Sequence, residues 1–201
     1  MKTYKFEDNE IVEIIKNGGV IALPTETVYG LGVKYSSKEA FDNLVRAKNR
    51  NPDKPFTLML SSKEEIEKYA FLDDKIKRVI DMFVPGEITL LLKPKNNLFP
   101  WVTLNSSTIG IRVSGLKEVG ELIKRVGEPM LITSANISSF PSCLTYEETK
   151  KVFDNRIDAI IEGKTLSSIP STIVICDEKS IKLIRQGNIP FEEIERIWKG
   201  E

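Results

Sequence analysis

Apolar residues recur at the spacing of one helix face in several stretches of the chain. The first stretch follows Asp8, a suitable N-cap, and stops at Gly18-Gly19. A second helix is expected to begin at Ser37. The same spacing and end signals predict further helices over residues 62–69, 73–83 and 116–126, one that starts at a Thr145/Glu148 capping box and ends near Phe153, and a short one closed by Trp198.

Short apolar runs between these stretches predict strands. They cover residues 19–24, 56–60, 88–93, 108–113, 130–133, 159–161, 172–176 and 181–184, and polar loops are expected over 96–107 and 134–142. Strands and helices are mixed without strict alternation, and the chain shows no repeat and no linker. The pattern therefore predicts one α/β (α+β) domain over residues 1–201, built around a large sheet.

Composition narrows the chemistry that this domain can perform. The chain has 29 Lys plus Arg and 29 Asp plus Glu, so no global field attracts nucleic acid or an anionic membrane. It has no histidine, which excludes triads, general bases and metal sites that need one. Two cysteines cannot build a four-cysteine zinc site or a disulfide framework. Since no apolar run is long enough to span a bilayer, we expect a cytoplasmic protein without a membrane partner.

The segment PTETVYGLG, residues 24–32, follows the first predicted strand directly. Its hydroxyls and carboxylate cluster at a strand end, where ligands bind in open α/β sheets, and its glycines allow close backbone approach. A tight turn stabilised by threonine and glutamate side chains would explain the same nine residues.

A second segment, RAKNRNPDKP at residues 46–55, brings four cations and one acid to a predicted helix end. Lys48 and Arg50 are two apart, so they share a face only where the helix has unwound, which Pro52 favours. Such a pair suits a polyphosphate, with arginine binding it bidentately. The alternative is that the cations complement the helix C-terminus.

Two further strands carry polar groups. In TIGIRV, residues 108–113, alternation places Thr108, Gly110 and Arg112 on one face, where the arginine either pairs with a carboxylate or binds an anionic ligand. The segment ITSANISSFPS, residues 132–142, has a density of hydroxyl and amide groups that suits sugar and phosphate recognition or simply satisfies the backbone. PSTIVI from Pro170 and IRQG from Ile184 also place polar groups beside strands.

Together these segments, with PGEITLLLK after residue 84, occur in the order and spacing of the YrdC family, which the chain resembles from about residue 8 to residue 187. FTLML, TIGIRV and GEPML are shared with its YciO branch. The resemblance implies a twisted mixed sheet with flanking helices around a basic concave cavity. Because the chain ends shortly after Arg185, we expect no additional C-terminal domain. Ser139 stands where the family motif after Asn136 has glycine.

The resemblance also implies a reaction. Family members are threonylcarbamoyl-AMP synthases, nucleotidyltransferases that form threonylcarbamoyl-adenylate and pyrophosphate from L-threonine, bicarbonate or CO2, and ATP with Mg2+. The product serves t6A modification at adenosine 37 of ANN-reading tRNAs through the threonylcarbamoyl-transferase machinery. Matched motif by motif, Lys48 and Arg50 are the expected catalytic cations, and no residue is expected to ligate a metal. The expected L-threonine contacts are Thr27, Arg112, Ile132 and Ser171, and the expected ATP contacts are Lys48, Arg50, Lys54, Thr108, Ser134, Asn136, Ser142 and Arg185.

Two other functions are compatible with the same motifs. A non-catalytic module that binds tRNA or double-stranded RNA would use the basic cavity without turnover. The balanced charge speaks against it, because affinity for a polyanion rests largely on phosphate neutralisation. A nucleotide-binding domain with another amino-acid-like substrate is the third hypothesis.

Overall fold

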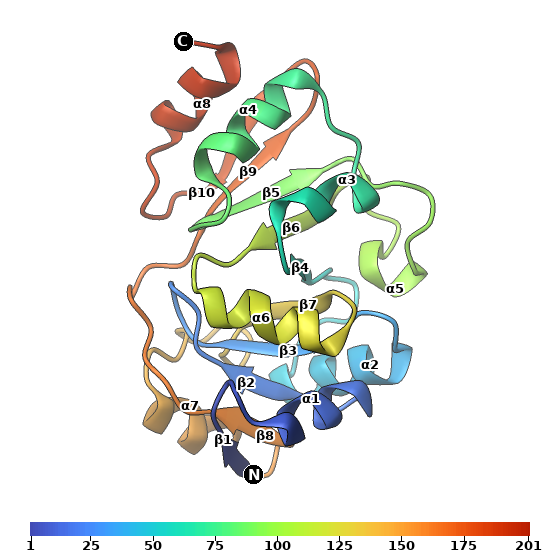
Figure 1. Ribbon diagram of the computed structural model, residues 1–201, viewed down its shortest axis with the longest axis vertical. Coiled ribbons are helices and arrows are strands. Elements are labelled where there is room, and N and C mark those ends of the chain that lie inside the picture. The colour runs from blue at the N-terminus through green and yellow to red at the C-terminus, as the bar shows by residue number, and fades with distance from the viewer.

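A computed structural model describes residues 1–201, which form one continuous ten-stranded mixed sheet (Figure 1). Its strand order is β1-β8-β2-β3-β7-β4-β6-β5-β9-β10. Parallel pairs join β1 to β8, β2 to β8, β4 to β6 and β5 to β9, and the other neighbours are antiparallel. The strands are β1 Lys2–Tyr4, β2 Ile21–Leu23, β3 Gly30–Lys34, β4 Thr57–Leu60, β5 Ile88–Leu92, β6 Ile109–Val113, β7 Met130–Ser134, β8 Ala159–Ile161, β9 Thr172–Cys176 and β10 Ile181–Arg185.

Three helices begin at side-chain caps in the predicted segments, whereas Asp8, the expected N-cap of the first helix, makes no capping hydrogen bond with its side chain. Ser37 and Asp73 accept hydrogen bonds from the backbone N–H groups three residues on, and Thr145 with Glu148 forms the complete capping box. The helices are α1 Asn9–Lys16, α2 Lys38–Lys48, α3 Ile66–Tyr69, α4 Asp74–Phe83, α5 Pro100–Thr103, α6 Lys117–Val126, α7 Tyr146–Phe153 and α8 Phe191–Lys199, and a 3-10 turn Lys63–Glu65 leads into α3.

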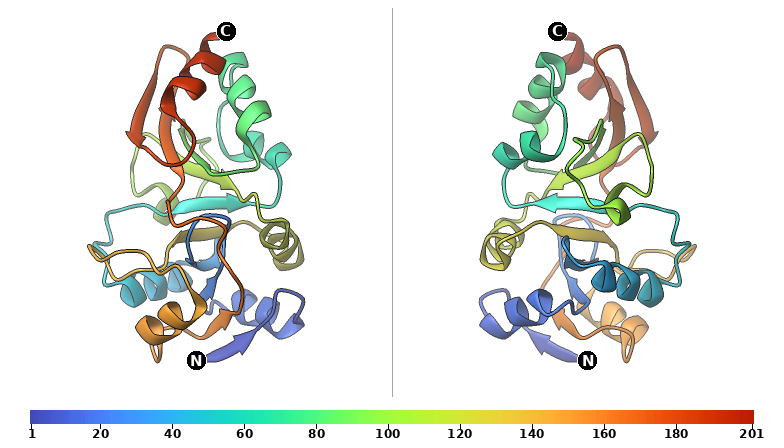
Figure 2. Two further views of the ribbon diagram at one scale, coloured as in Figure 1. Left: turned by 90° about the vertical axis from the view of Figure 1, so that its left-hand side faces the viewer. Right: turned by 90° about the vertical axis from the view of Figure 1, so that its right-hand side faces the viewer.

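Helices cover both faces of the sheet. Figure 2 shows α1 and α6 on one side of the lower strands and α2 and α7 on the other, with the two termini at opposite ends of the molecule. A cluster of 37 buried apolar residues forms the main core, and a second cluster of 14 lies beneath α1 and α6. This arrangement confirms the predicted twisted mixed sheet with flanking helices. None of the helices has the length and apolar character needed to cross a membrane.

The structure adds three elements that the sequence pattern does not predict. β1 is three residues long and carries no apolar alternation, and α5 is a single turn begun by Pro100 within the expected loop 96–107. β3 runs through the glycines of PTETVYGLG, a segment for which the sequence predicts a ligand-binding strand end or a tight turn and not a second strand. These strand positions need glycine because β7 lies close. A Cβ on Gly32 would lie 2.9 Å from Met130 Cε, and one on Gly30 would lie 3.0 Å from Ile132 Cγ2.

Candidate active site

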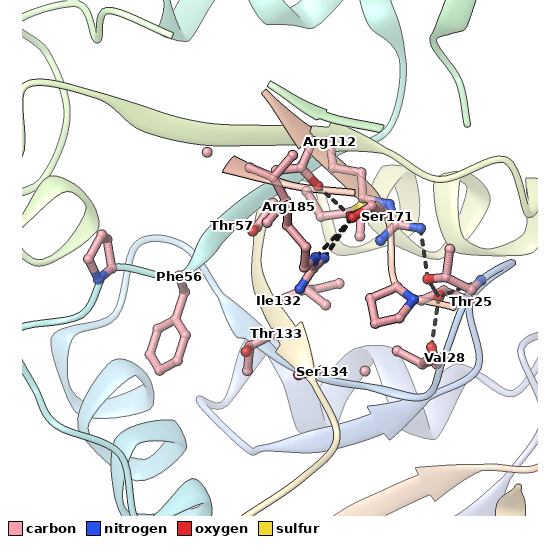
Figure 3. Close-up of a pocket in the computed structure, with 18 of the residues that line it drawn as sticks. Thr25, Val28, Phe56, Thr57, Arg112, Ile132, Thr133, Ser134, Ser171 and Arg185 are labelled. Carbon is pink, nitrogen blue, oxygen red and sulfur yellow. Dashed lines mark hydrogen bonds between the residues drawn. The ribbon is translucent and has the colours of Figure 1, made fainter. Parts of the chain in front are cut away.

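A cavity of about 300 Å³ opens on one face of the central strands (Figure 3). It is lined by residues of β3, β7, β4, β6, β5, β9 and β10, and of the segments that precede β3, β4 and β9. Its volume is at the lower end of the range for small-molecule sites. Its lining includes Thr25, Thr27, Arg50, Thr57, Met59, Thr89, Arg112, Ile132, Ser134, Ser171 and Arg185.

Strand alternation produces this polar face. On β6, Gly110 and Arg112 face the cavity, while Ile109, Ile111 and Val113 belong to the main core. β4 and β5 divide their side chains between cavity and core in the same way. The face predicted for TIGIRV is therefore confirmed for these residues, and the sheet itself presents an arginine to a ligand.

Arg112 is held by a buried ion pair. Its Nη2 lies 2.6 Å from Glu26 Oε1, and the two side chains are only 10% and 6% exposed. Ser114 Oγ donates to the other carboxylate oxygen. Burial acts to raise the pKa of Glu26, but the charge of Arg112 and the hydrogen bonds from Ser114, Arg112 and the Gly115 backbone hold that pKa below its ordinary value. Glu26 is thus an anion at neutral pH, and Arg112 Nε remains without a hydrogen-bond partner.

Hydrogen bonds fix the orientation of the Thr25 and Thr27 hydroxyls beside this pair. Thr25 Oγ1 donates to the Val28 carbonyl at 2.7 Å and lies 3.0 Å from Thr27 Oγ1. Arg112 Nη2 donates to Thr27 Oγ1 at 3.0 Å. Since Thr25 uses its proton on Val28, the Thr27 hydroxyl donates to Thr25 and accepts from Arg112.

Arg185 enters the cavity from the end of β10. Its Nε and Nη2 donate to the Ser171 carbonyl at 3.1 and 2.8 Å, and Thr89 Oγ1 lies 2.9 Å from Ser171 Oγ. Figure 3 shows its guanidinium directed toward Ile132, beside Arg112. Partial burial lowers the pKa of Arg185, and the positive charge of Arg112 acts in the same direction.

Arg50 also belongs to the cavity wall. α2 ends at Lys48, and Asn49 caps it in the left-handed conformation, so Arg50 lies beyond the helix. Its Nη2 donates to the Pro55 carbonyl at 3.1 Å, and its guanidinium stacks 5.1 Å from the centre of the Phe56 ring. Burial lowers the pKa of Arg50 as well.

Lys48 is 1% exposed and lies behind the wall. Its Nζ donates to the Ser134 carbonyl at 2.5 Å, to the Asn136 carbonyl at 2.9 Å and to Asn136 Oδ1 at 2.8 Å. Burial, followed by the nearby charge of Arg50, lowers the pKa of Lys48 to about 7. The ammonium therefore ties α2 to the segment that carries Ser134.

Comparison with known proteins places this chain in a family. The Sua5/YciO/YrdC family model, described as "Telomere recombination", matches residues 13–187. A Methanocaldococcus jannaschii protein named "Putative threonylcarbamoyl-AMP synthase" is 33% identical over 98% of this chain and 96% of that protein. The chain belongs to the Sua5/YciO/YrdC family. The resemblance expected from the motifs is confirmed.

Solved structures of this family share the fold. Pyrococcus abyssi Sua5, solved in complex with L-threonine, superposes with a TM-score of 0.88 at 30% identity over 94% of this chain and 56% of that one. Escherichia coli YciO superposes with a TM-score of 0.85 at 30% identity, over 92% of this chain and 91% of that one. The chain spans 54% of the length of the threonylcarbamoyl-AMP synthase of P. abyssi and 54% of the length of that of Bacillus subtilis.

The structure brings together most of the site residues expected for a Sua5/YciO/YrdC chain. The cavity wall includes Thr27, Arg50, Arg112, Ile132, Ser134, Ser171 and Arg185. Five others lie outside it, namely Lys48, Lys54, Thr108, Asn136 and Ser142. Lys48 and Asn136 bind each other behind Ser134, and the Lys54 carbonyl accepts from Arg50 Nε while its side chain is exposed. The Arg50 and Lys48 side chains therefore contact different partners, and the structure does not bring them together as a pair that could bind one polyphosphate.

Sequence reasoning missed Thr25, Thr57, Thr89 and Glu26 as site residues. Glu26 had a signal, because it is the one carboxylate of PTETVYGLG, and pairing with a carboxylate was one of the two hypotheses for Arg112. Thr57 and Thr89 had none beyond their strand positions. Ser139, which replaces the family glycine, adopts a left-handed φ of 72° that glycine accepts more readily.

Gly187 supports the Arg185 side of the cavity. A Cβ there would lie 2.4 Å from the Pro170 carbonyl and 2.4 Å from the Thr172 nitrogen, and backbone atoms cannot yield as a flexible side chain does. We expect Gly187→Ala to lower the free energy of unfolding by about 1–3 kcal/mol in urea denaturation. In Gly115→Ala the new Cβ meets nothing closer than 3.6 Å and serves as the control. Equal stability of the two variants would contradict the assigned close approach.

Proposed function

We propose that this chain is a threonylcarbamoyl-AMP synthase, which forms threonylcarbamoyl-adenylate and pyrophosphate from L-threonine, bicarbonate or CO2, and ATP. The observation that carries the proposal is the convergence of Arg50, Arg112 and Arg185 with a set of hydroxyls in one cavity. The names of the relatives and the threonine complex of P. abyssi Sua5 support the same reaction. As a nucleotidyltransferase the chain would transfer the adenylyl group of ATP.

The cavity suits a reaction that needs alignment more than proton transfer. The threonine amine takes up CO2 to give a carbamate, and a carbamate oxygen attacks the α-phosphorus of ATP and expels pyrophosphate. We assign the amino acid to Thr27, Arg112, Ile132 and Ser171, and the triphosphate to Arg50, Arg185 and Ser134. Guanidiniums fixed before the reaction stabilise the charge that develops on the phosphates, which is the largest contribution in many active sites.

Magnesium is proposed only as the ion that accompanies ATP. The chain has no cluster of three or more His, Cys, Asp or Glu side chains that could hold a metal, and no acidic side chain lines the cavity. The residues present therefore do not fit an ion held by the protein. Mg2+ commonly binds through phosphates and water with few protein ligands, which agrees with entry as the ATP complex.

The wider role follows from the reaction. We propose that residues 1–201 act as a single YrdC-like domain in the cytoplasm and that the product passes to tRNA through a threonylcarbamoyl-transferase machinery. The continuous sheet, which joins all ten strands, supports the single domain. The reaction supports the partners, because a mixed anhydride of carbamate and phosphate is an activated donor.

One incubation tests the proposed function. Purified protein is mixed with ATP, Mg2+, bicarbonate and L-threonine, and pyrophosphate is measured after each component is left out in turn. We expect pyrophosphate only in the complete mixture, and L-serine in place of L-threonine tests the amino-acid specificity. Salt-sensitive RNA binding with no threonine-dependent loss of ATP would instead favour the RNA-binding module.

A further inference from the structure

The three arginines of the cavity differ in whether a neighbouring carboxylate neutralises their positive charge. Arg112 is bound to Glu26, whose carboxylate lies directly behind it. Arg50 and Arg185 have no acidic partner within 4.0 Å, and their hydrogen bonds go to carbonyl and hydroxyl oxygens. Since no acidic side chain lines the cavity, two of the guanidiniums act on a ligand with their full charge and the third does not.

The Glu26–Arg112 pair is built to stay neutral. Both side chains are at least nine-tenths buried, and Ser114 Oγ and Arg112 Nη2 each bind a carboxylate oxygen. Thr27 Oγ1 takes a further hydrogen from the same Nη2. A pair held on both partners this way exposes guanidinium N–H groups to the cavity without exposing a net charge.

The two kinds of arginine match two kinds of substrate. An amino acid is a zwitterion whose carboxylate needs hydrogen-bond donors but whose net charge is zero. A triphosphate is a polyanion that favours the positions where positive charge is uncompensated. Figure 3 shows Arg112 on the Thr25 side of the cavity and Arg185 nearer its centre, so the neutral and charged positions are adjacent. Without a device that separates them, a polyphosphate could occupy both.

We propose that Glu26 is a specificity-determining residue, which neutralises Arg112 so that this end of the cavity accepts an amino-acid carboxylate and excludes polyphosphate. The proposal rests on the proposed function for the identity of the two substrates. Glu26 does not touch either substrate; it acts through Arg112.

The test uses Glu26→Gln, which keeps the size of the side chain, replaces one of its two acceptor oxygens by an NH2 donor and removes its charge. Inorganic triphosphate is titrated by calorimetry into wild type, Glu26→Gln and Glu26→Asp. We expect Glu26→Gln to bind triphosphate about tenfold more tightly or better, and Glu26→Asp, which keeps the charge, to bind as wild type does. In the double variant Glu26→Gln/Arg112→Gln the affinity should return to the wild-type value. Unchanged affinity in Glu26→Gln would overturn the proposal.

A steady-state experiment gives a second readout. In Glu26→Gln, triphosphate should become a competitive inhibitor against L-threonine, whereas in wild type it should compete with ATP alone. A merely structural role for Glu26 would raise the KM for L-threonine in the variant without changing the pattern of inhibition. That result would contradict the proposed exclusion of polyphosphate by Glu26.

If Glu26→Gln alone does not fold, the double variant Glu26→Gln/Arg112→Gln is compared with Arg185→Gln. The double variant removes the neutral pair as a whole and should leave triphosphate affinity within about twofold of wild type, while Arg185→Gln should lower it about tenfold or more. Equal losses in both variants would overturn the proposal. Triphosphate binding requires neither threonine nor turnover. A wild-type protein that releases no pyrophosphate would therefore refute the proposed function, while the binding measurements would still test the role of Glu26.

Discussion

Arg50→Ala lowers the rate of threonine-dependent pyrophosphate release by about 10²-fold or more, with little change in the free energy of unfolding. Arg50 lies on the cavity wall without an acidic partner, so its charge is available to a triphosphate. A donor aimed at charge that develops in the transition state typically contributes this much, because its position is fixed before the reaction begins. Its loss should reduce kcat more than it raises the KM for L-threonine.

Arg46→Ala provides the matched control. Arg46 lies on the exposed side of α2, its side chain hydrogen-bonds only to Asn43, and it lies outside the cavity. Arg46→Ala removes one positive charge from the same segment as Arg50→Ala does, so a general effect of net charge would appear in both variants. Pyrophosphate release measured at saturating ATP and L-threonine should be close to wild type in Arg46→Ala. Wild-type turnover in Arg50→Ala would remove Arg50 from the catalytic machinery.

The fold was predictable where local patterns agree with the tertiary structure. The caps at Ser37, Asp73 and Thr145 mark helix starts because the bonds that define them are local. β3 was not predictable in this way. Along the chain its glycines suggest close backbone approach to a ligand, whereas in the structure it is the side chains of β7 that approach so closely that the strand must lack Cβ atoms there.

The site was predictable as a set of segments and not as a set of contacts. Arg112 could be placed on a polar strand face, but its partner Glu26 is 86 residues away, and nothing in local spacing distinguishes an ion pair from a ligand contact. Lys48 shows the same limit. Its spacing from Arg50 suggests a shared phosphate, whereas in the structure its ammonium binds the chain some 86 residues further on.

Lys48→Met is expected to reduce turnover about as severely as Arg50→Ala, for a different reason. The substitution keeps an unbranched side chain and leaves the Ser134 and Asn136 carbonyls without their donor. Ser134 belongs to the cavity wall, so the segment that positions it loses its attachment to α2. The pyrophosphate assay described for Arg50→Ala measures this loss.

The same variant has a second signature in stability. The pKa of Lys48 is about 7 in the folded protein, because of burial and then Arg50, and about 10.4 in an unfolded chain. Between those values the unfolded state binds more protons, so the free energy of unfolding of wild type rises with pH across that window. Each pKa unit corresponds to about 1.4 kcal/mol, and the total rise is a few kcal/mol.

Methionine does not titrate, so Lys48→Met lacks this contribution. Urea denaturation of both proteins from about pH 5 to about pH 10 should show a constant difference in stability below about pH 7, and above it the stability of wild type gaining on that of the variant as pH increases. Other groups that titrate in this range are common to both proteins and cancel in the difference. Parallel curves across the whole range would mean that the ammonium keeps its ordinary pKa, because its three oxygen acceptors, the Ser134 and Asn136 carbonyls and Asn136 Oδ1, fully replace water.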